Sequence, residues 1–420
     1  MLELTIEEGK PLCIPDGFEK HKIHESLLRL SDKLGIRAFK WKGGQLYAAE
    51  VVGCIQTHGI RINILPKLDT PEEHRDKNFL YNLLHEAGFL EKPKFNPGSV
   101  RKTSLPLLEV IISNLIYQVE DHLADGVPRR YESNKEDSQS PKGKIDIPRL
   151  SSRAPGNSTV PIIFNSLSPD NRLSQIVVSV LDRLYTLTKN NINRQRLSAL
   201  LSKLSGIKKL SMTASSINTL KLSSSETHWE SFLNVAKMFF ESYAPDPTFS
   251  GQGNAINIIF KMEHLFERTM RNIISEALRG SAFSTTHRSP PLYLFNDATS
   301  NQGIVRLKPD YLLKKGNNHI AVADAKWKRL SPSARAFGVE RDDLYQISSY
   351  LERYKVSVGI FFVPQAPWMS HDWAPLYTAP NGSANIYFVP IDLETLLSRS
   401  SIKKDSAYKK ISKRLLEILN

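Results

Sequence analysis

Three charged side chains stand in an otherwise apolar stretch of the sequence, "IVRLKPDYLLKKGNNHIAVADAKW" (residues 304–327). Asp310 lies in the first apolar run, and Asp324 and Lys326 lie at the end of the second. Burying a charge inside a protein is costly unless the charge is paired or holds a metal ion. The stretch therefore predicts a chemical site rather than two ordinary core strands.

The stretch is predicted to form a β-hairpin that joins residues 304–313 to residues 319–327 across the turn "KKGNN". Side chains alternate between the two faces of a strand, so Asp324 and Lys326 would project together from a face that is otherwise apolar. Asp310, near the middle of the first strand, would come close to Asp324. The alternative is an exposed hairpin whose Asp324–Lys326 pair contributes little to stability.

Two carboxylates a few Å apart repel one another, and both lose hydration when they are buried. Asp310 and Asp324 are therefore predicted to hold a divalent cation, Mg²⁺ or alternatively Mn²⁺, because Mg²⁺ prefers oxygen ligands. Such an ion can polarise a phosphodiester and activate a bound water, while Lys326 orients that water or stabilises the developing negative charge. The order Pro-Asp, then (Asp/Glu)-x-Lys, is typical of metal-dependent nucleases.

Two predicted helices that flank the hairpin carry further candidates. Glu263 and Glu267 share one helix face, so Glu267 is predicted as a third metal ligand, although Glu267 and Arg271 also fit an ordinary i,i+4 ion pair. Gln346 and Tyr350 are likewise four residues apart on the helix after the hairpin. Their amide and hydroxyl groups are predicted to hold a substrate phosphate or to order the lysine.

The composition favours a polyanionic partner. Lys and Arg number 56 against 43 Asp and Glu, a net charge of +13, so nucleic acid is the leading candidate, although a merely basic protein has the same balance. Two cysteines exclude a disulfide framework and a cysteine-rich zinc site. The N-terminus does not resemble a signal peptide, and the longest apolar run is too short and too polar to span a bilayer. A cytoplasmic protein without a membrane partner is expected.

The pattern of hydrophobic residues predicts an α+β multidomain protein with three parts. Residues 1–100 are predicted as a β-rich domain, residues 101–250 as a helical middle region, and residues 251–420 as an α/β nuclease domain. Strands are expected within 38–68, broken at Gly43-Gly44 and His58-Gly59. Helices are expected at 104–123, 172–188, 229–243 and 258–280. The polar, basic segment 126–158 is expected to be an exposed loop with short strands.

Beyond these patterns, the sequence resembles a family, the McrC subunit of McrBC-type modification-dependent restriction systems. Similar motifs follow in the family's order between about residues 50 and 365: "VVGCIQTHGIRINILPKL", "DGVPRRYESN…PKGKIDIPR", "LSPDNRLSQIVVSVL", "LFER", "LKPDYLL", "VADAKWK" and "YQISSY". The chain departs from the pattern at Lys142, where arginine is usual, and at Trp327, where tyrosine is common.

The resemblance implies an endonuclease with a PD-(D/E)xK core that cleaves double-stranded DNA with Mg²⁺ in a bacterial or archaeal cytoplasm. It also implies a partner, a hexameric McrB-like AAA+ GTPase or NTPase, which the family's N-terminal part binds and stimulates. The chain has no Gly-x-x-x-x-Gly-Lys-(Ser/Thr) loop, so the motor would be a separate chain. The basic segment 126–149 is predicted to enter the partner ring. No site for a nucleotide or organic cofactor is predicted.

Two alternatives remain open at this point. The first is a catalytically inert adaptor that activates a AAA+ NTPase. The second is a stand-alone RecB-like DNA nuclease that needs no motor. The presence of both carboxylates and the lysine argues against the adaptor, and the long segment before residue 251 argues against the stand-alone nuclease.

Overall fold

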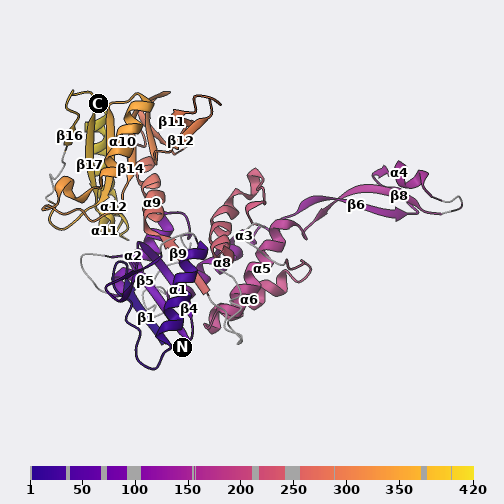
Figure 1. Cartoon of the computed structure of the whole chain (residues 1–420). Helices are drawn as coiled ribbons and strands as arrows, with labels where there is room; N and C mark the ends of the chain where they lie inside the picture. Colours follow the sequence, from indigo (N-terminus) through magenta and orange to yellow (C-terminus); the bar gives the residue numbers. More distant parts are fainter. Residues whose placement is uncertain are drawn as a thin grey trace. The chain divides into compact units, whose positions relative to one another are not determined.

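The chain folds into two compact units, residues 1–92 with 257–420, and residues 93–256. The structure, a computed structural model, describes residues 2–34, 38–67, 73–91, 106–153, 156, 158–210, 217–241, 256–287, 289–369, 376–398 and 400–420. The predicted domain boundaries at residues 100 and 250 lie outside these ranges, so the three-domain division stays a prediction. The prediction of a mixed α and β protein with several sheets is confirmed (Figure 1).

The first half of the first unit is built around a four-stranded sheet in the order β1-β5-β4-β9. Ile55, Ile60, Ile62 and Ile64 are fully buried in its core. The elements are β1 (Leu2–Glu7), α1 (Lys20–Leu34), β2 (Phe39–Lys42), β3 (Gln45–Ala48), β4 (Val51–Thr57), β5 (Ile60–Leu65), α2 (Glu73–Glu86) and β9 (Ile256–Lys261). The strands predicted within 38–68 are confirmed with their breaks, whereas helix α1 was missed.

The second half of the same unit contains a six-stranded mixed sheet in the order β10-β13-β14-β15-β17-β16. Helix α10 joins the parallel strands β14 and β15, and α9 and α12 pack against β14 and β17. The elements are α9 (Met262–Ala277), β10 (Phe283–Thr286), β11 (Leu292–Asn296), β12 (Gly303–Leu307), β13 (Tyr311–Lys315), β14 (Asn318–Ala325), the 3-10 turn η3 (Arg335–Gly338), α10 (Arg341–Tyr354), β15 (Val358–Pro364), β16 (Leu376–Thr378), β17 (Asn385–Ile391), α11 (Leu393–Leu396) and α12 (Ser401–Leu419).

Two predictions about this half need correction. Residues 304–313 do not form one strand, because β12 ends at Leu307 and pairs with β11, while β13 begins at Tyr311 and pairs with β14. Pro309 has no backbone N–H to donate to a ladder, so the strand breaks there. The helix predicted over 258–280 begins only at Met262, since the residues before it extend the first sheet as β9. Its buried residues, among them Met262, Phe266 and Met270, recur at helical spacing along one face.

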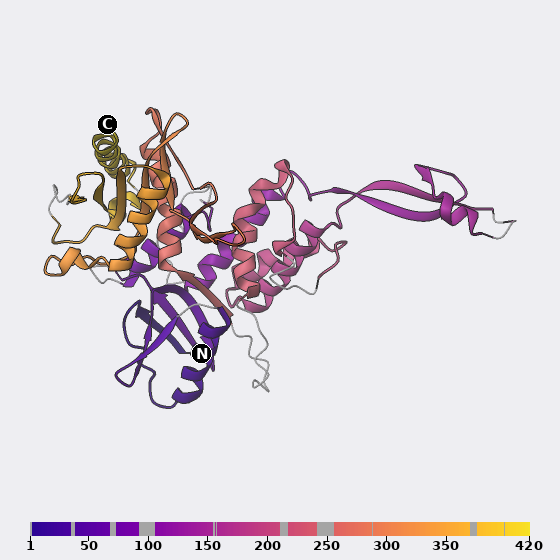
Figure 2. The same ribbon diagram turned by 45° about the horizontal axis from the view of Figure 1, so that its top comes forward.

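The second unit combines a group of helices with a long two-stranded ribbon. Its elements are α3 (Leu107–His122), β6 (Arg130–Ser138), β7 (Lys144–Ile145), α4 (Ile147–Ser151), β8 (Val160–Ser168), α5 (Arg172–Leu187), α6 (Asn191–Lys203), the 3-10 turn η2 (Ser224–Trp229) and α8 (Glu230–Glu241). In Figures 1 and 2, β6 and β8 run side by side away from the helices of this unit. No helix in the described part of the chain is long and apolar enough to cross a membrane.

The ribbon corrects the prediction of an exposed loop with short strands over 126–158, because the segment is exposed but β6 is nine residues long and fully paired. Strands β6 and β8 pair antiparallel over their whole lengths, from Arg130 opposite Ser168 to Ser138 opposite Val160. Near the tip, Gly143 has a φ of +78°, and a Cβ there would lie 2.5 Å from the carbonyl oxygen of Ile163. Only glycine fits this position. The residues are polar because both faces of the ribbon are largely open to solvent, not because the segment lacks structure.

A buried carboxylate organises the helices of this unit. Glu109 of α3 is 2% exposed and accepts hydrogen bonds from Thr188 Oγ1 at 2.6 Å, Lys189 N at 2.7 Å and Asn193 Nδ2 at 3.0 Å. Thr188 and Lys189 lie in the connection between α5 and α6, and Asn193 lies in the first turn of α6. Glu109 therefore ties three helices together.

Replacing Glu109 by Ala is expected to lower the free energy of unfolding by about 3 kcal/mol, because three donors, two of them in buried hydrogen bonds, lose their acceptor. Chemical denaturation monitored by circular dichroism measures this change. Glu132 is exposed on β6, and Glu132→Ala is the control, with an expected change within about 0.5 kcal/mol. Equal effects of the two variants would contradict the role of Glu109.

Candidate active site

Two aspartates meet where β13 begins and β14 ends. Tyr311 pairs with Ala323 in the antiparallel ladder, so Asp310, one residue before Tyr311, comes beside Asp324, one residue after Ala323. Asp310 Oδ2 accepts a hydrogen bond from the backbone N–H of Ala325 at 2.8 Å. The structure therefore brings the two predicted metal ligands together, although the first aspartate lies between two strands rather than within one.

The carboxylate of Asp324 makes Asp310 harder to ionise. Asp324 is 3% exposed. Burial, and then the neighbouring carboxylate of Asp324, hold the pKa of Asp310 well above its ordinary value. The ammonium of Lys326 forms an ion pair with Asp324 Oδ2, with the nitrogen 2.5 Å from the oxygen.

Lys326 is the buried counter-charge of the site. It is 8% exposed, and its Nζ lies 3.2 Å from Asp343 Oδ1 and donates to Gln346 Oε1 at 3.0 Å. Burial alone would lower the pKa of Lys326, but Asp324 and Asp343 overcome this and raise it above the ordinary value. The lysine is therefore held in its charged form by three groups from two elements.

Asp343 is a site residue that the sequence analysis missed. It is 8% exposed in the first turn of α10, where it also binds the Nζ of Lys328 at 2.5 Å. Burial raises the pKa of Asp343, but the two lysines, Lys328 and Lys326, lower it by more than burial raises it. The pKa of Asp343 is therefore below its ordinary value. Asp343, Gln346 and Tyr350 are three and four residues apart on one helix face, which is the signal that could have revealed it.

The two helix residues predicted beside the site have different contacts. Gln346 is exposed and orders the lysine, which is one of its two predicted contacts. Tyr350 is 4% exposed, and its hydroxyl donates to the backbone carbonyl of Lys308 at 3.0 Å. It fixes the chain just before Pro309 and Asp310, and so places the first aspartate rather than contacting the carboxylates.

Glu267 lies near the two aspartates without joining them. It is half-buried on α9, and its carboxylate lies 3.6 Å from Arg271 Nη2, which is the i,i+4 pair considered above. Burial raises the pKa of Glu267, Arg271 opposes this, and Asp324 adds to it. The ligand oxygens of Glu267 and the two aspartates are not all within 4.8 Å of one another. Glu263 is exposed.

The donor set fits a hard divalent cation. Asp310 and Asp324 offer two adjacent carboxylates, whose mutual repulsion a bound cation would relieve. Mg²⁺ is commonly held by one or two carboxylates and completes its shell with water and substrate oxygens. The two aspartates would hold the ion, and Glu267 is close enough to interact electrostatically with both of them.

Asp310→Asn is expected to raise the melting temperature of the metal-free protein at pH 8. The folded pKa of Asp310 lies above its unfolded value near 3.9, so the carboxyl costs stability that grows as pH rises from about 4 toward the folded pKa. The gain should therefore shrink at pH 5. Thermal unfolding in a chelator measures it. Added Mg²⁺ should stabilise the wild type but not the variant, and equal stabilisation of both would contradict the assignment of Asp310 as a ligand.

Comparisons with known proteins agree with the motif order. Residues 46–363 match the family described as McrBC 5-methylcytosine restriction system component. No curated protein matches the chain. The fold is shared with a chain of the refined half-complex from a tetradecameric assembly of Thermococcus gammatolerans McrB AAA+ hexamers with bound McrC. The TM-score is 0.66 at 16% identity, and the match covers 99% of this chain and 100% of that one.

A second solved structure, the cryo-EM structure of the Thermococcus gammatolerans McrBC complex, matches with a TM-score of 0.53 at 18% identity. It covers 66% of this chain and 88% of that one. At these identities the structures show a common fold. The family match spans most of the chain, and the resemblance noted in the sequence points to the same family. The chain is therefore a McrC-like protein that belongs to the McrBC 5-methylcytosine restriction system component family.

Proposed function

We propose that the chain is the Mg²⁺-dependent DNA endonuclease subunit of a McrBC-like restriction complex, acting against foreign DNA such as that of phages. The observation that carries this proposal is the meeting of Asp310, Asp324 and Lys326 at one strand end, with all three side chains largely enclosed. Membership of a restriction-system family supports DNA as the substrate. The net charge of +13 is consistent with a polyanion.

Each residue has a distinct role in the proposed cleavage. Asp310 and Asp324 would hold Mg²⁺, which when bound supplies a polarised phosphodiester and an activated water. Lys326 would stabilise negative charge on the phosphate or orient the attacking water. Asp343 and Gln346 keep the ammonium at the strand end, and Tyr350 fixes the segment that carries Asp310. Glu267 would act through its charge or through a metal-bound water.

The architecture around the site supports a PD-(D/E)xK core. Strands β13, β14 and β15 form the centre of a mixed sheet, and the acidic residues and the lysine lie at the end of the central strand β14. Helix α9, which carries Glu267, precedes these strands, and α10, whose Asp343 and Gln346 contact Lys326, follows them. This order of a helix, a strand pair, a helix and a parallel strand fits a nuclease core.

The proposed partner is a hexameric AAA+ ring, a GTPase or another NTPase. McrB AAA+ hexamers with bound McrC are present in the similar complex, and this chain has no phosphate-binding loop of its own. The tip of the β6–β8 ribbon is the proposed docking element, and its first strand, β6, lies in the segment 126–149 that was predicted to enter the partner ring. The tip exposes apolar side chains beside basic ones, namely Ile145, Ile147, Leu150, Lys142, Lys144 and Arg149.

Asp324→Ala and Lys326→Ala are each expected to lower Mg²⁺-dependent DNA cleavage at least about 100-fold, since each removes a group that acts on the reacting phosphate. Stimulation of the partner NTPase should stay unchanged. Asp342→Ala removes a neighbouring exposed carboxylate of α10 and serves as the control, with cleavage like the wild type. Cleavage assays with the purified partner, nucleotide and methylated plasmid measure the effect.

Undiminished cleavage by both variants would contradict the assignment of Asp324 and Lys326 as catalytic residues. Efficient degradation of plain DNA by the chain alone would contradict the dependence on a motor and favour a stand-alone nuclease. If no cleavage occurs but the NTPase is stimulated, the chain is an adaptor.

Ile147→Asp is expected to lower stimulation of the partner NTPase at least about tenfold, because a charge replaces an apolar side chain that is 67% exposed near the ribbon tip. The melting temperature should not change. Ile402→Asp is the matched control, since Ile402 is 81% exposed on α12. NTPase rates at increasing concentrations of the chain measure the effect, and equal rates for both variants would rule out the tip as the docking element.

A further inference from the structure

The residue that follows the site lysine is held by the other sheet of the same unit. Trp327 is next to Lys326, and its indole Nε1 donates a hydrogen bond to Glu8 Oε1 at 2.7 Å. Side chains alternate along an extended segment, so the indole projects away from the carboxylates that Lys326 contacts. The ring also packs against Phe266 of α9, with centroids 5.6 Å apart. Trp327 therefore connects the strand end with two other elements.

Glu8 is a buried carboxyl at the end of β1. It is 6% exposed, its Oε1 also accepts from the backbone N–H of Lys67 at 3.3 Å, and its Oε2 has no hydrogen-bond partner. Burial raises the pKa of Glu8 to about 7, although the bond from Trp327 lowers it. An apolar residue would fill this position at a lower cost of desolvation. The contact with the indole is the gain that offsets this cost.

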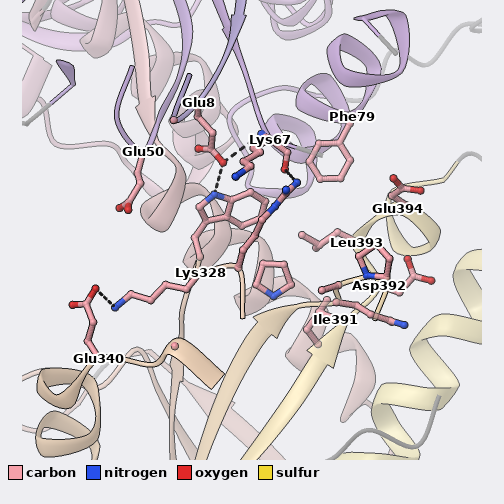
Figure 3. A pocket seen from close by; sticks show the side chains of 18 residues that line it. Glu8, Glu50, Lys67, Phe79, Lys328, Glu340, Ile391, Asp392, Leu393 and Glu394 are labelled. Atoms are coloured by element: carbon pink, nitrogen blue, oxygen red, sulfur yellow. Dashed lines mark hydrogen bonds and ion pairs between the residues drawn. The ribbon is translucent and has the colours of Figure 1, made fainter. Parts of the chain in front are cut away.

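A second bond holds the same segment to the same sheet. Arg329 Nη2 donates to the backbone carbonyl of Lys67 at 3.0 Å. Residues 327–329 are therefore hydrogen-bonded both to Glu8, which follows β1, and to Lys67, which follows β5. A cavity of about 570 Å³ runs along this segment, and Glu8, Lys67 and Lys328 are among its lining residues (Figure 3). Where a cavity replaces packed side chains, directional hydrogen bonds decide where the backbone lies.

The geometry points to Glu8 as a positioning residue for the proposed nuclease site, which acts through Trp327 to fix the segment that carries Lys326. The inference rests on the proposed function. If Glu8 has this role, the N-terminal sheet helps to position a residue of the cleavage site, in addition to any part it has in binding the partner. A displacement of Lys326 by about 1 Å can cost as much as 100-fold in rate. The N-terminal sheet can therefore alter cleavage without contacting DNA.

The test compares Glu8→Leu, Glu8→Gln, Trp327→Phe and the double variant Glu8→Leu/Trp327→Phe in the complex with the partner. Glu8→Leu and Trp327→Phe should each lower kcat for DNA cleavage about tenfold with an unchanged KM. The double variant should be no slower than Glu8→Leu, because both changes remove the same bond. Glu8→Gln keeps an acceptor for the indole and should stay within about threefold of the wild type.

Glu50→Gln is the matched control, because Glu50 lines the same cavity and is exposed. It should cleave like the wild type. NTPase stimulation should not change in Trp327→Phe, which keeps an aromatic ring at this position. Wild-type kcat in both Glu8→Leu and Trp327→Phe, or additive losses in the double variant, would overturn the inference. An equal loss in Glu8→Gln would overturn it as well.

A second readout separates failure of this inference from failure of the proposed function. Hydrogen–deuterium exchange of the free chain should show faster exchange of residues 325–329 in Glu8→Leu and Trp327→Phe, and no change in Glu50→Gln. If the wild-type complex does not cleave DNA, the proposed function fails. In that case, unchanged exchange of residues 325–329 would still overturn the inference that Glu8 positions Lys326 through Trp327. Faster exchange in the two variants would support it.

Discussion

The first unit is arranged around the burial of like charges at one strand end. Asp310 and Asp324 lie side by side with little access to water, which is unfavourable for both when they are ionised. Lys326 offsets part of this repulsion, and it is itself largely buried. A cluster of this kind survives only where surrounding elements fix each member. Three contacts fix the members of this cluster: the register of β13 on β14, the ion pair of Asp343 in α10 with Lys326, and the hydrogen bond from Tyr350 to the carbonyl of Lys308.

The chain connection explains why helix α10 supplies the supporting residues. β14 and β15 are parallel, so the chain must return along the sheet between them, and α10 makes this return. Ile347 and Tyr350 pack in the same core cluster as Val322 of β14. Asp324 and Lys326 share the face of Val322 by alternation, and so the residues of α10 that flank this apolar contact reach the lysine. The same packing that stabilises the sheet therefore orders the candidate site.

Local patterns in the sequence predicted the parts of the site that depend on local geometry. Period-two alternation placed Asp324 with Lys326, and helical spacing placed Gln346 with Tyr350. The break at Pro309 and the ribbon were missed because each depends on which distant segment pairs with a strand. β6 is polar on both faces, so its pairing with β8, more than 20 residues later, leaves no alternation to detect. The Glu8–Trp327 bond joins residues 319 positions apart, which no local pattern can indicate.

The position of Lys326 has a consequence for how the site can take up a cation. Its ammonium lies 2.5 Å from Asp324 Oδ2, an oxygen of one of the two proposed metal ligands. A cation held by both aspartates would compete with the ammonium for Asp324, since two positive charges at one carboxylate oxygen would repel each other strongly at this distance. Asp343 and Gln346 can retain the displaced lysine, because they bind it from the opposite element. A restraint on the segment after Lys326 limits how far the ammonium can move. The Glu8–Trp327 bond and the carboxylate pair thus act on the same quantity, the position of one lysine nitrogen.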